Sequence, residues 1–360
     1  MFGQAGGKEL ISLEIVLGNG DIVRTGFAAL PEPDWSVPSP HAIYPDLTGI
    51  FVHSLGTLGI ITKASVRIYY RNEEQAMPVG AFDTLKDAYE TVKKLERAYL
   101  IESGPIFHWR DVEFFGIHVN NPMEKIDEKL DQLLESPDIP PFEKRGEMPY
   151  CFVPLIISGY KGEIENRVKF ISKFVDKHHG KILSEDELRR YLGDGYYETW
   201  QLGFMDHTPM DQIIRMKAQR FQVNSTAFVG PPRKCVEAEP EILRKIWDLE
   251  QEFKKKGLKL QSAGYYFHPA DQARTCYFRA GIFTTGSRKE VEKILHELND
   301  LAIKKYSLHP APATWRNYYV DKVLASYYNL YKHLKEYCDP NNIMNTGMDM
   351  LSKPSEVVKF

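Results

Sequence analysis

The stretch GIFVHSLGTLGIIT, residues 49–62, places two glycines around small residues between an apolar segment and a β-rich run. Gly56 and Gly59 carry no Cβ, so the backbone here can approach a ligand closely. Backbone N–H groups exposed in such a turn can bind a phosphate or a carbonyl oxygen. The alternative is a glycine turn that binds no ligand. The spacing is not GxGxxG and no clear Rossmann helix follows, so the stretch does not predict a nicotinamide site.

A second group of reactive side chains lies in the segment WRNYY, residues 315–319. Arg316 presents a permanent charge with forked donors, which suits a carboxylate or a phenolate. The hydroxyl of Tyr318 or Tyr319 can share a substrate proton or orient the anion. The alternatives are a salt bridge for Arg316 at a helix start and packing roles for the tyrosines, which recur at helical spacing. We predict that Arg316 binds an anion, assisted by Tyr318 or Tyr319.

The elements that must position these residues predict an α+β fold. Asn19-Gly20 separates two β-rich runs and indicates a hairpin. The Asp339-Pro340-Asn341 turn ends the last predicted helix. Strand and helix patterns follow one another in an order that predicts an antiparallel sheet with helices on one face. Predicted strands cover residues 10–17, 22–25, 64–70, 77–82, 105–112, 151–158, 260–267 and 275–283, and predicted helices cover 84–99, 163–178, 239–255 and 287–305.

Two separated motifs resemble one family in the expected order. GIFVHSLGTLGIITKASVRI is similar to the "GlF.gSeGtLGIvTeatl" stretch of FAD-linked oxidases, and DPNNIMNTG is similar to their C-terminal "DPxxImNPGK". The resemblance implies the vanillyl-alcohol-oxidase fold, also called the p-cresol-methylhydroxylase (PCMH) type. Residues 1–72 would be the second FAD subdomain, residues 73–310 a cap with a ferredoxin-like antiparallel sheet, and residues 311–360 a helix returning to the FAD domain. The first subdomain, which holds the pyrophosphate, is not recognised. We therefore expect either a truncation or a second polypeptide that supplies it.

The resemblance also implies which residues contact FAD. In the family the backbone of the SeGtLGI stretch does so, which transfers to Ser54, Leu55, Gly56, Thr57, Leu58, Gly59, Ile60 and Ile61. Asp46 matches an acidic position upstream, where it can also simply cap a turn, and Asn345 matches the Asn of the NPG motif. Leu55 stands where many members have Glu. Thr346 and Met348 replace the usual Pro and Lys, so the side-chain contacts made by that Glu and Lys are absent.

The resemblance leaves two substrate classes open. One branch of the family oxidises 2-hydroxy acids with a metal held by two histidines, but here only His268 matches and Thr275 replaces the second. We therefore predict no metal site. The other branch oxidises para-substituted phenols with a Tyr-Arg pair, for which Trp315-Arg316 is a changed counterpart. We predict FAD-dependent oxidation of a small anionic alcohol, 2-hydroxy acid or phenol. The alternative is a non-catalytic or assembly subunit of a split flavoenzyme.

Composition restricts the partners. The 46 basic and 49 acidic residues give a net charge of −3, which argues against nucleic-acid binding. No run of eighteen apolar residues occurs, so we expect no membrane span. The four cysteines form no CxxC pair, which argues against a zinc or iron–sulfur site and suits a reducing cytosol. We expect a cytoplasmic homo-oligomer that acts on a small-molecule substrate.

Overall fold

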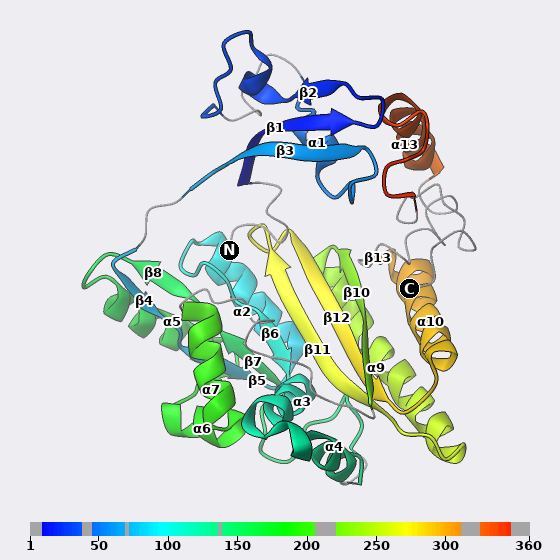
Figure 1. Ribbon diagram of the computed structural model, residues 1–360. Helices are drawn as coiled ribbons and strands as arrows, with labels where there is room; N and C mark the ends of the chain where they lie inside the picture. Colours follow the sequence, from blue (N-terminus) through cyan, green and yellow to red (C-terminus); the bar gives the residue numbers. More distant parts are fainter. Residues whose placement is uncertain are drawn as a thin grey trace. The chain divides into compact units, whose positions relative to one another are not determined.

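The computed structural model divides the chain into two compact units (Figure 1). The larger unit contains Asn72–Pro310, and the smaller joins Gly3–Arg71 to Ala311–Phe360. The glycine-rich stretch and the C-terminal DPNN turn therefore belong to the same unit, although they are far apart in the sequence. The structure describes residues 9–37, 45–68, 72–135, 139–205, 221–310 and 325–346.

The smaller unit contains a three-stranded antiparallel sheet in the order β2-β1-β3. The predicted Asn-Gly hairpin joins β1 to β2, with Gly20 at φ 93° and the Leu17 N–H donating to Asp21 O at 2.9 Å. One face of β1 packs against the short helix α1 and the C-terminal helix α13 in a common hydrophobic core. The elements are β1 (Leu10–Leu17), β2 (Ile22–Arg24), a 3-10 turn (Gly26–Ala29), α1 (Thr48–Phe51), β3 (Gly59–Val66) and α13 (Ala325–Cys338).

The larger unit contains an eight-stranded sheet, and each pairing among its strands is antiparallel. In sheet order the strands are β13 (His309–Pro310), β10 (Gln222–Gly230), β12 (Thr275–Thr284), β11 (Leu260–Ala270), β6 (Ile106–His108), β7 (Cys151–Pro154), β5 (Val79–Phe82) and β9 (Gly180–Ile182). A separate two-stranded ribbon pairs β4 (Glu74–Ala76) with β8 (Ile157–Gly159). The expected α+β class is confirmed.

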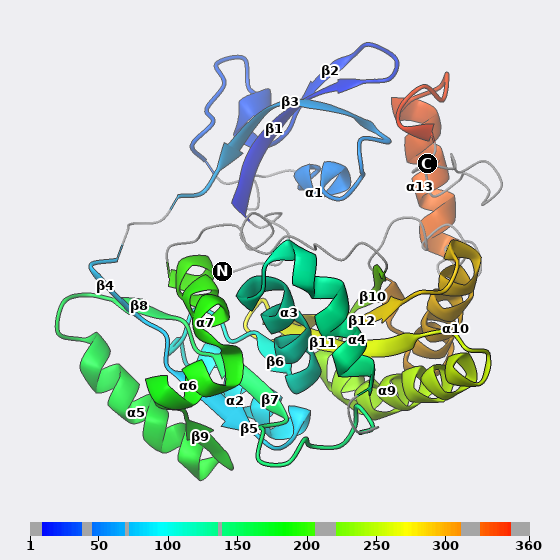
Figure 2. The ribbon, with the colours of Figure 1, turned by 60° about the horizontal axis from the view of Figure 1, so that its bottom comes forward.

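Helices cover both faces of this sheet, so the expectation of helices on one face was wrong (Figures 1 and 2). On one face, Tyr89 of α2 packs on Phe267 of β11 with ring centroids 5.9 Å apart. On the other face, Phe107 of β6 packs on Trp200 of α7 at 4.9 Å. Large aromatic residues alternate on both sides of β11, and both faces must therefore be buried. The helices are α2 (Leu85–Arg97), α3 (Trp109–Asn120), α4 (Ile126–Glu135), α5 (Ile164–Lys177), α6 (Glu185–Leu192), α7 (Asp194–Trp200), α9 (Pro232–Lys255) and α10 (Arg288–Tyr306).

Three predicted boundaries differ from the structure for local reasons. The strand expected over 105–112 ends at His108, whose side chain accepts a hydrogen bond from the Arg110 N–H at 3.2 Å and caps α3. Helix α9 starts at Pro232, where proline suits the first turn, and continues through Pro240. Strand β3 starts at Gly59 instead of Ala64, because Gly59 to Ile61 pair with β1. Gly59 is therefore part of the sheet.

Candidate cofactor loop and cap pocket

The loop Ser54–Leu58 of the smaller unit contains two exposed residues whose backbone N–H groups are not used within the described structure. Leu55 and Gly56 both have left-handed backbones, with φ 56° and 72°, and both are exposed. A Cβ at Gly56 would meet no atom within 4 Å. Among the described residues, no hydrogen bond is donated by the N–H of Leu55 or of Gly56. Two adjacent N–H groups with these properties can bind a carbonyl or phosphate oxygen, which fits the ligand-binding interpretation of Gly56.

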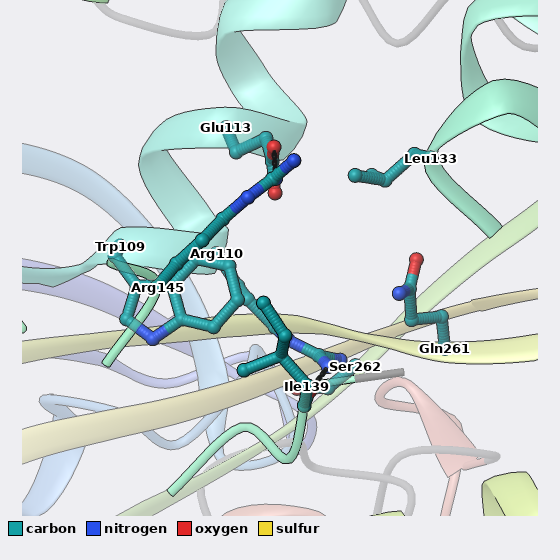
Figure 3. Close-up of a pocket in the computed structure, with 8 residues that line it drawn as sticks. All are labelled: Trp109, Arg110, Glu113, Leu133, Ile139, Arg145, Gln261 and Ser262. Atoms are coloured by element: carbon teal, nitrogen blue, oxygen red, sulfur yellow. Dashed lines mark hydrogen bonds and ion pairs between the residues drawn. The ribbon is translucent and has the colours of Figure 1, made fainter. Parts of the chain in front are cut away.

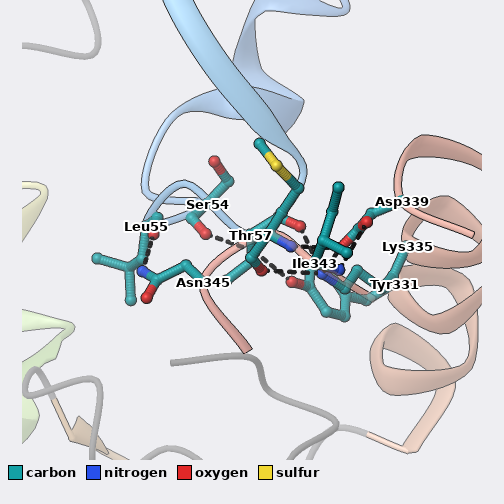
Figure 4. A network of polar contacts seen from close by, with 9 residues as sticks. Ser54, Leu55, Thr57, Tyr331, Lys335, Asp339, Ile343 and Asn345 are labelled. Carbon is teal, nitrogen blue, oxygen red and sulfur yellow. Dashed lines mark hydrogen bonds and ion pairs between the residues drawn. The ribbon is translucent and has the colours of Figure 1, made fainter. Parts of the chain in front are cut away.

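Side chains from both ends of the chain hold this loop (Figure 4). Thr57 is 2% exposed, and its hydroxyl donates to Ser54 O at 2.5 Å. Since that proton is used, the Tyr331 hydroxyl must donate to Thr57 Oγ1, 2.6 Å away. The Lys335 ammonium is also buried and donates to Thr57 O at 2.8 Å and to Met344 O at 3.1 Å. The loop is therefore fixed by interactions with α13.

Asp339, the first residue after α13, completes this network. Its carboxylate lies 2.5 Å from Lys335 Nζ and accepts the N–H groups of Ile343 and Met344 at 3.0 and 2.9 Å. Burial alone would raise the pKa of Asp339, but Lys335 and the two N–H groups outweigh it and lower the pKa below its ordinary value. A Cβ at Gly18 would lie 2.4 Å from Asp339 Oδ1, so the hairpin must have glycine there.

Asn345 joins the C-terminal turn directly to the loop. Its side-chain amide donates to Leu55 O at 2.5 Å, and its own backbone is left-handed at φ 42°. The structure thus brings the predicted residues Asn345 and Leu55 together. Sequence reasoning missed Tyr331, Lys335 and Asp339, although their spacing of four residues places them on one helical face and could have revealed them.

The other predicted cofactor residues have different surroundings. A Cβ at Gly59 would lie 2.6 Å from Ile15 Cγ2, so strand packing is sufficient to explain this glycine. Ile60 and Ile61 are 59% and 46% exposed on β3. Asp46 accepts the Thr48 N–H at 2.9 Å, as a turn cap does. Ser54 is half-buried, and Leu58 is in the core. Their contacts with FAD stay predictions, and Arg316, Tyr318 and Tyr319 lie outside the described residues.

His268 of β11 is placed between two hydroxyl groups. Its Nε2 lies 3.0 Å from Ser103 Oγ, and its Nδ1 lies 2.8 Å from the Tyr266 hydroxyl. Burial lowers the pKa of His268 to about 4, so the imidazole is neutral at pH 7. Both ring nitrogens are already used. Within the described ranges, no three His, Cys, Asp or Glu side chains are grouped closely enough to hold a metal ion.

The larger unit also contains a cavity of about 290 Å³ between α3 and the strands β10, β11 and β12. Its polar residues include Asp111 and Arg279, whose Oδ1 and Nη2 atoms are 3.3 Å apart. Burial raises the pKa of Asp111 to about 7, with Arg279 opposing the shift. Sequence reasoning did not identify this pair. The apolar part of the wall includes Phe114, Phe115, Phe221, Val223 and Ala263.

A second pocket, at the start of α3, is too small to hold a small-molecule ligand (Figure 3). Its free volume is about 10 Å³, roughly that of one water molecule. Arg145 forms an ion pair with Glu113 there, and the Trp109 indole donates to Glu143 O at 3.0 Å. We interpret this pocket as a structural polar cluster.

Comparison with known proteins identifies the class. No family model matches the chain. It is 30% identical over 129 residues to D-lactate dehydrogenase [cytochrome] 1, mitochondrial, of Saccharomyces cerevisiae, which is 36% of this chain and 17% of that protein. It is 37% identical over 92 residues to glycolate oxidase subunit GlcD of Bacillus subtilis, which is 26% of this chain and 18% of that protein. The matches therefore span less than a fifth of each of these two relatives.

Solved structures agree on the fold. The 4-ethylphenol oxidase from Gulosibacter chungangensis aligns with a TM-score of 0.68 at 16% identity, covering 95% of this chain and 66% of that one. p-Cresol methylhydroxylase aligns with a TM-score of 0.63 at 16% identity, covering 96% of this chain and 66% of that one. The fold is thus the PCMH type, and parts of the chain are similar in sequence to a D-lactate dehydrogenase and a glycolate oxidase subunit. This confirms the resemblance recognised in the sequence.

Proposed function

We propose that this chain forms part of an FAD-dependent oxidoreductase that oxidises a small anionic alcohol, 2-hydroxy acid or para-substituted phenol. The observation that supports it best is the loop at Leu55 and Gly56, whose two N–H groups donate no hydrogen bond among the described residues while buried side chains of α13 hold the loop. FAD, when bound, supplies the acceptor for a hydride from the substrate carbon. The names of the sequence relatives indicate hydroxy acids, and those of the solved structures include phenols.

The chain's own residues would orient the cofactor. The N–H groups of Leu55 and Gly56 would donate to a carbonyl or phosphate oxygen, and Asn345 would keep the Leu55 carbonyl turned away from that oxygen. Lys335 and Tyr331 would keep the loop in this conformation before the ligand arrives, which reduces the entropy cost of binding. Arg316 would bind the substrate anion, with Tyr318 or Tyr319 sharing its proton.

The first test is the visible absorption spectrum of the purified chain, alone and after FAD is added. We expect bound-flavin bands that disappear when D-lactate, glycolate or 4-ethylphenol is added without oxygen. A colourless protein that does not bind added FAD would contradict binding by this chain alone. Bound flavin that is reduced by none of these substrates, and by no aromatic 2-hydroxy acid such as 3-phenyllactate, would contradict the proposed substrate classes.

The second candidate is a non-catalytic or assembly subunit that works with another polypeptide. It is favoured by strand β3, which in the described part of the chain pairs with β1 alone and has exposed apolar residues. Ile60, Val66 and the nearby Ile68 are 59%, 53% and 86% exposed. Exposed apolar edge strands commonly form protein interfaces. A homo-oligomer would use the same surface, so Ile60→Lys should lower the mass measured by sedimentation if copies associate there.

The membrane relation and the cellular location of the chain are separate from these tests. No helix among the described residues has the length and apolar character needed to cross a bilayer. The expected cytoplasmic location stays a prediction, since the yeast relative is named as mitochondrial.

A further inference from the structure

The 290 Å³ cavity of the larger unit combines one cation with an aromatic wall. At about 30 Å³ for each water-sized group, it has room for about ten such groups. This volume is at the lower end of the range for small-molecule sites, and the composition is typical of them. Phe114, Phe115 and Phe221 supply the apolar contacts, and Ser225 and Asn224 lie at the end of the cavity formed by β10.

A bulge in β11 places the charged end of the cavity. The register of β11 against β12 shifts between Ser262 and Tyr265, and Gly264 in this bulge has φ 76°. A Cβ at Gly264 would lie 2.3 Å from the Asp111 backbone nitrogen, so only glycine permits this approach of α3 to the strand. The start of α3, and with it Asp111, is therefore held against the sheet by backbone contact.

Arg279 is suited to bind an anion in this cavity. Its side chain is 30% exposed, whereas that of Asp111 is 3% exposed. The guanidinium carbon lies 5.5 Å from the Phe115 ring and 5.6 Å from the Tyr266 ring, so its faces are shielded from water. Arg279 meets Asp111 through one nitrogen at 3.3 Å, which leaves other donors of the fork for a ligand.

Arg279 satisfies only one of the two carboxylate oxygens of Asp111. Its Oδ1 accepts from Arg279, but its buried Oδ2 has no hydrogen-bond partner among the described residues. A buried carboxylate in this situation is costly, and it is relieved when a ligand donates to it or when it takes up a proton. A hydroxyl group next to a bound carboxylate would reach such an oxygen.

We propose that this cavity binds the substrate as a 2-hydroxy acid with an aromatic side chain. The carboxylate would pair with Arg279, which would then take the anion-binding role proposed above for Arg316. The 2-hydroxyl would form a hydrogen bond with Oδ2 of Asp111, and the ring would lie among Phe114, Phe115 and Phe221. The assignment as substrate rests on the proposed function, but the binding itself does not require flavin. The proposal selects aromatic hydroxy acids over lactate and glycolate, which would leave the phenylalanine wall uncovered.

The test is calorimetric titration of the full chain with 3-phenyllactate, lactate and the neutral 3-phenyl-1-propanol. We expect 3-phenyllactate to bind at least about 10-fold more tightly than either of the others, because only it has both the charge and the ring. Arg279→Met should weaken 3-phenyllactate about 10- to 100-fold and leave the neutral alcohol unchanged. Arg274→Met is the matched control, since this arginine is 65% exposed, lies outside the cavity, and its loss should change nothing.

Two further variants keep the test decisive. If Arg279→Met does not fold, the double variant Asp111→Asn/Arg279→Met removes both charges together and should still lose the preference for 3-phenyllactate over the alcohol. Equal binding of 3-phenyllactate by wild type and Arg279→Met would overturn the proposal, as would a loss caused by Arg316→Met alone. Because titration needs no flavin, absence of FAD binding with normal titrations would count against the proposed function and not against this pocket.

Discussion

Lys335 in the smaller unit and Arg279 in the larger unit are both partly or fully buried cations. They differ in how fully their hydrogen-bond donors are used by the protein. Lys335 is 4% exposed and donates to a carboxylate and two backbone carbonyls, which can use all three of its protons. Arg279 is 30% exposed and meets one oxygen of Asp111, whose other oxygen lacks a partner among the described residues. The first arrangement is typical of a structural support, and the second is typical of a binding site, where polar groups await a ligand.

The largest expected effect comes from Lys335→Met. This change leaves Asp339 buried without its cation, which should lower the free energy of unfolding of the smaller unit by about 3–5 kcal/mol. Urea denaturation and hydrogen exchange at residues 54–58 would measure it. The control is Lys332→Met, because Lys332 is 54% exposed and lies 3.9 Å from Glu336, so its loss should cost less than about 0.5 kcal/mol. Equal costs for both lysines would remove the support role.

The next largest expected effect is a dependence on pH of the affinity of the larger unit for 3-phenyllactate. The carboxyl of Asp111 faces Arg279 from β12, Tyr266 from β11 and Tyr196 from α7, and burial raises the pKa values of both tyrosines, so they stay neutral near pH 7. Below its pKa of about 7, Asp111 is protonated and does not compete for Arg279. The affinity for 3-phenyllactate should therefore be highest below pH 7 and fall above it, by at most about tenfold per pH unit for one linked proton.

The control for this pH dependence is Asp111→Asn, which has no proton to lose. Its affinity for 3-phenyllactate should stay constant from pH 6 to pH 8.5. A wild-type affinity that is equally flat would mean that Asp111 does not change its protonation when the anion binds.

The smallest expected effect is that of Tyr331→Phe. The change removes the hydroxyl that donates to Thr57 Oγ1 at 2.6 Å and should cost about 1 kcal/mol of unfolding free energy. Tyr327→Phe is the control, since Tyr327 is 54% exposed. If the loop is a cofactor site, Tyr331→Phe should also weaken FAD binding by a few-fold. An unchanged stability would show that Thr57 is held sufficiently by its bond to Ser54.

Local signals predicted much of the fold. Asn19-Gly20 marked the hairpin. Thr84 and Ser287, where two of the predicted helices begin, cap α2 and α10 by accepting the N–H groups of Asp87 and Glu290. The predicted strand over 105–112 was wrong beyond His108, because its apolar residues fit both the strand period of two and the helix period of about 3.6. The side chain of His108 caps α3, so the chain continues as a helix. The loop at Gly56 was predicted from its glycine, because glycine marks positions where the local backbone takes a conformation that other residues avoid.

The proposed binding pocket could not be predicted from local signals. Asp111 and Arg279 are 168 residues apart, and their meeting depends on the sheet order and on the bulge at Gly264. Thr57 and Tyr331 are 274 residues apart, and only the packing of α13 on β1 brings them together. Such contacts are set by tertiary packing, which single-sequence patterns do not encode.

The bulge at Gly264 gives the charged end and the aromatic end of the pocket different kinds of structural support. The charged end is anchored by close main-chain approach between β11 and α3, which requires glycine at position 264. The aromatic end is built from the side chains of Phe114 and Phe115 on α3 and of Phe221, the residue before β10. In the proposed binding mode, the length of the ligand would therefore depend on Phe114, Phe115 and Phe221, whereas recognition of its charge would depend on the separately anchored end of the pocket.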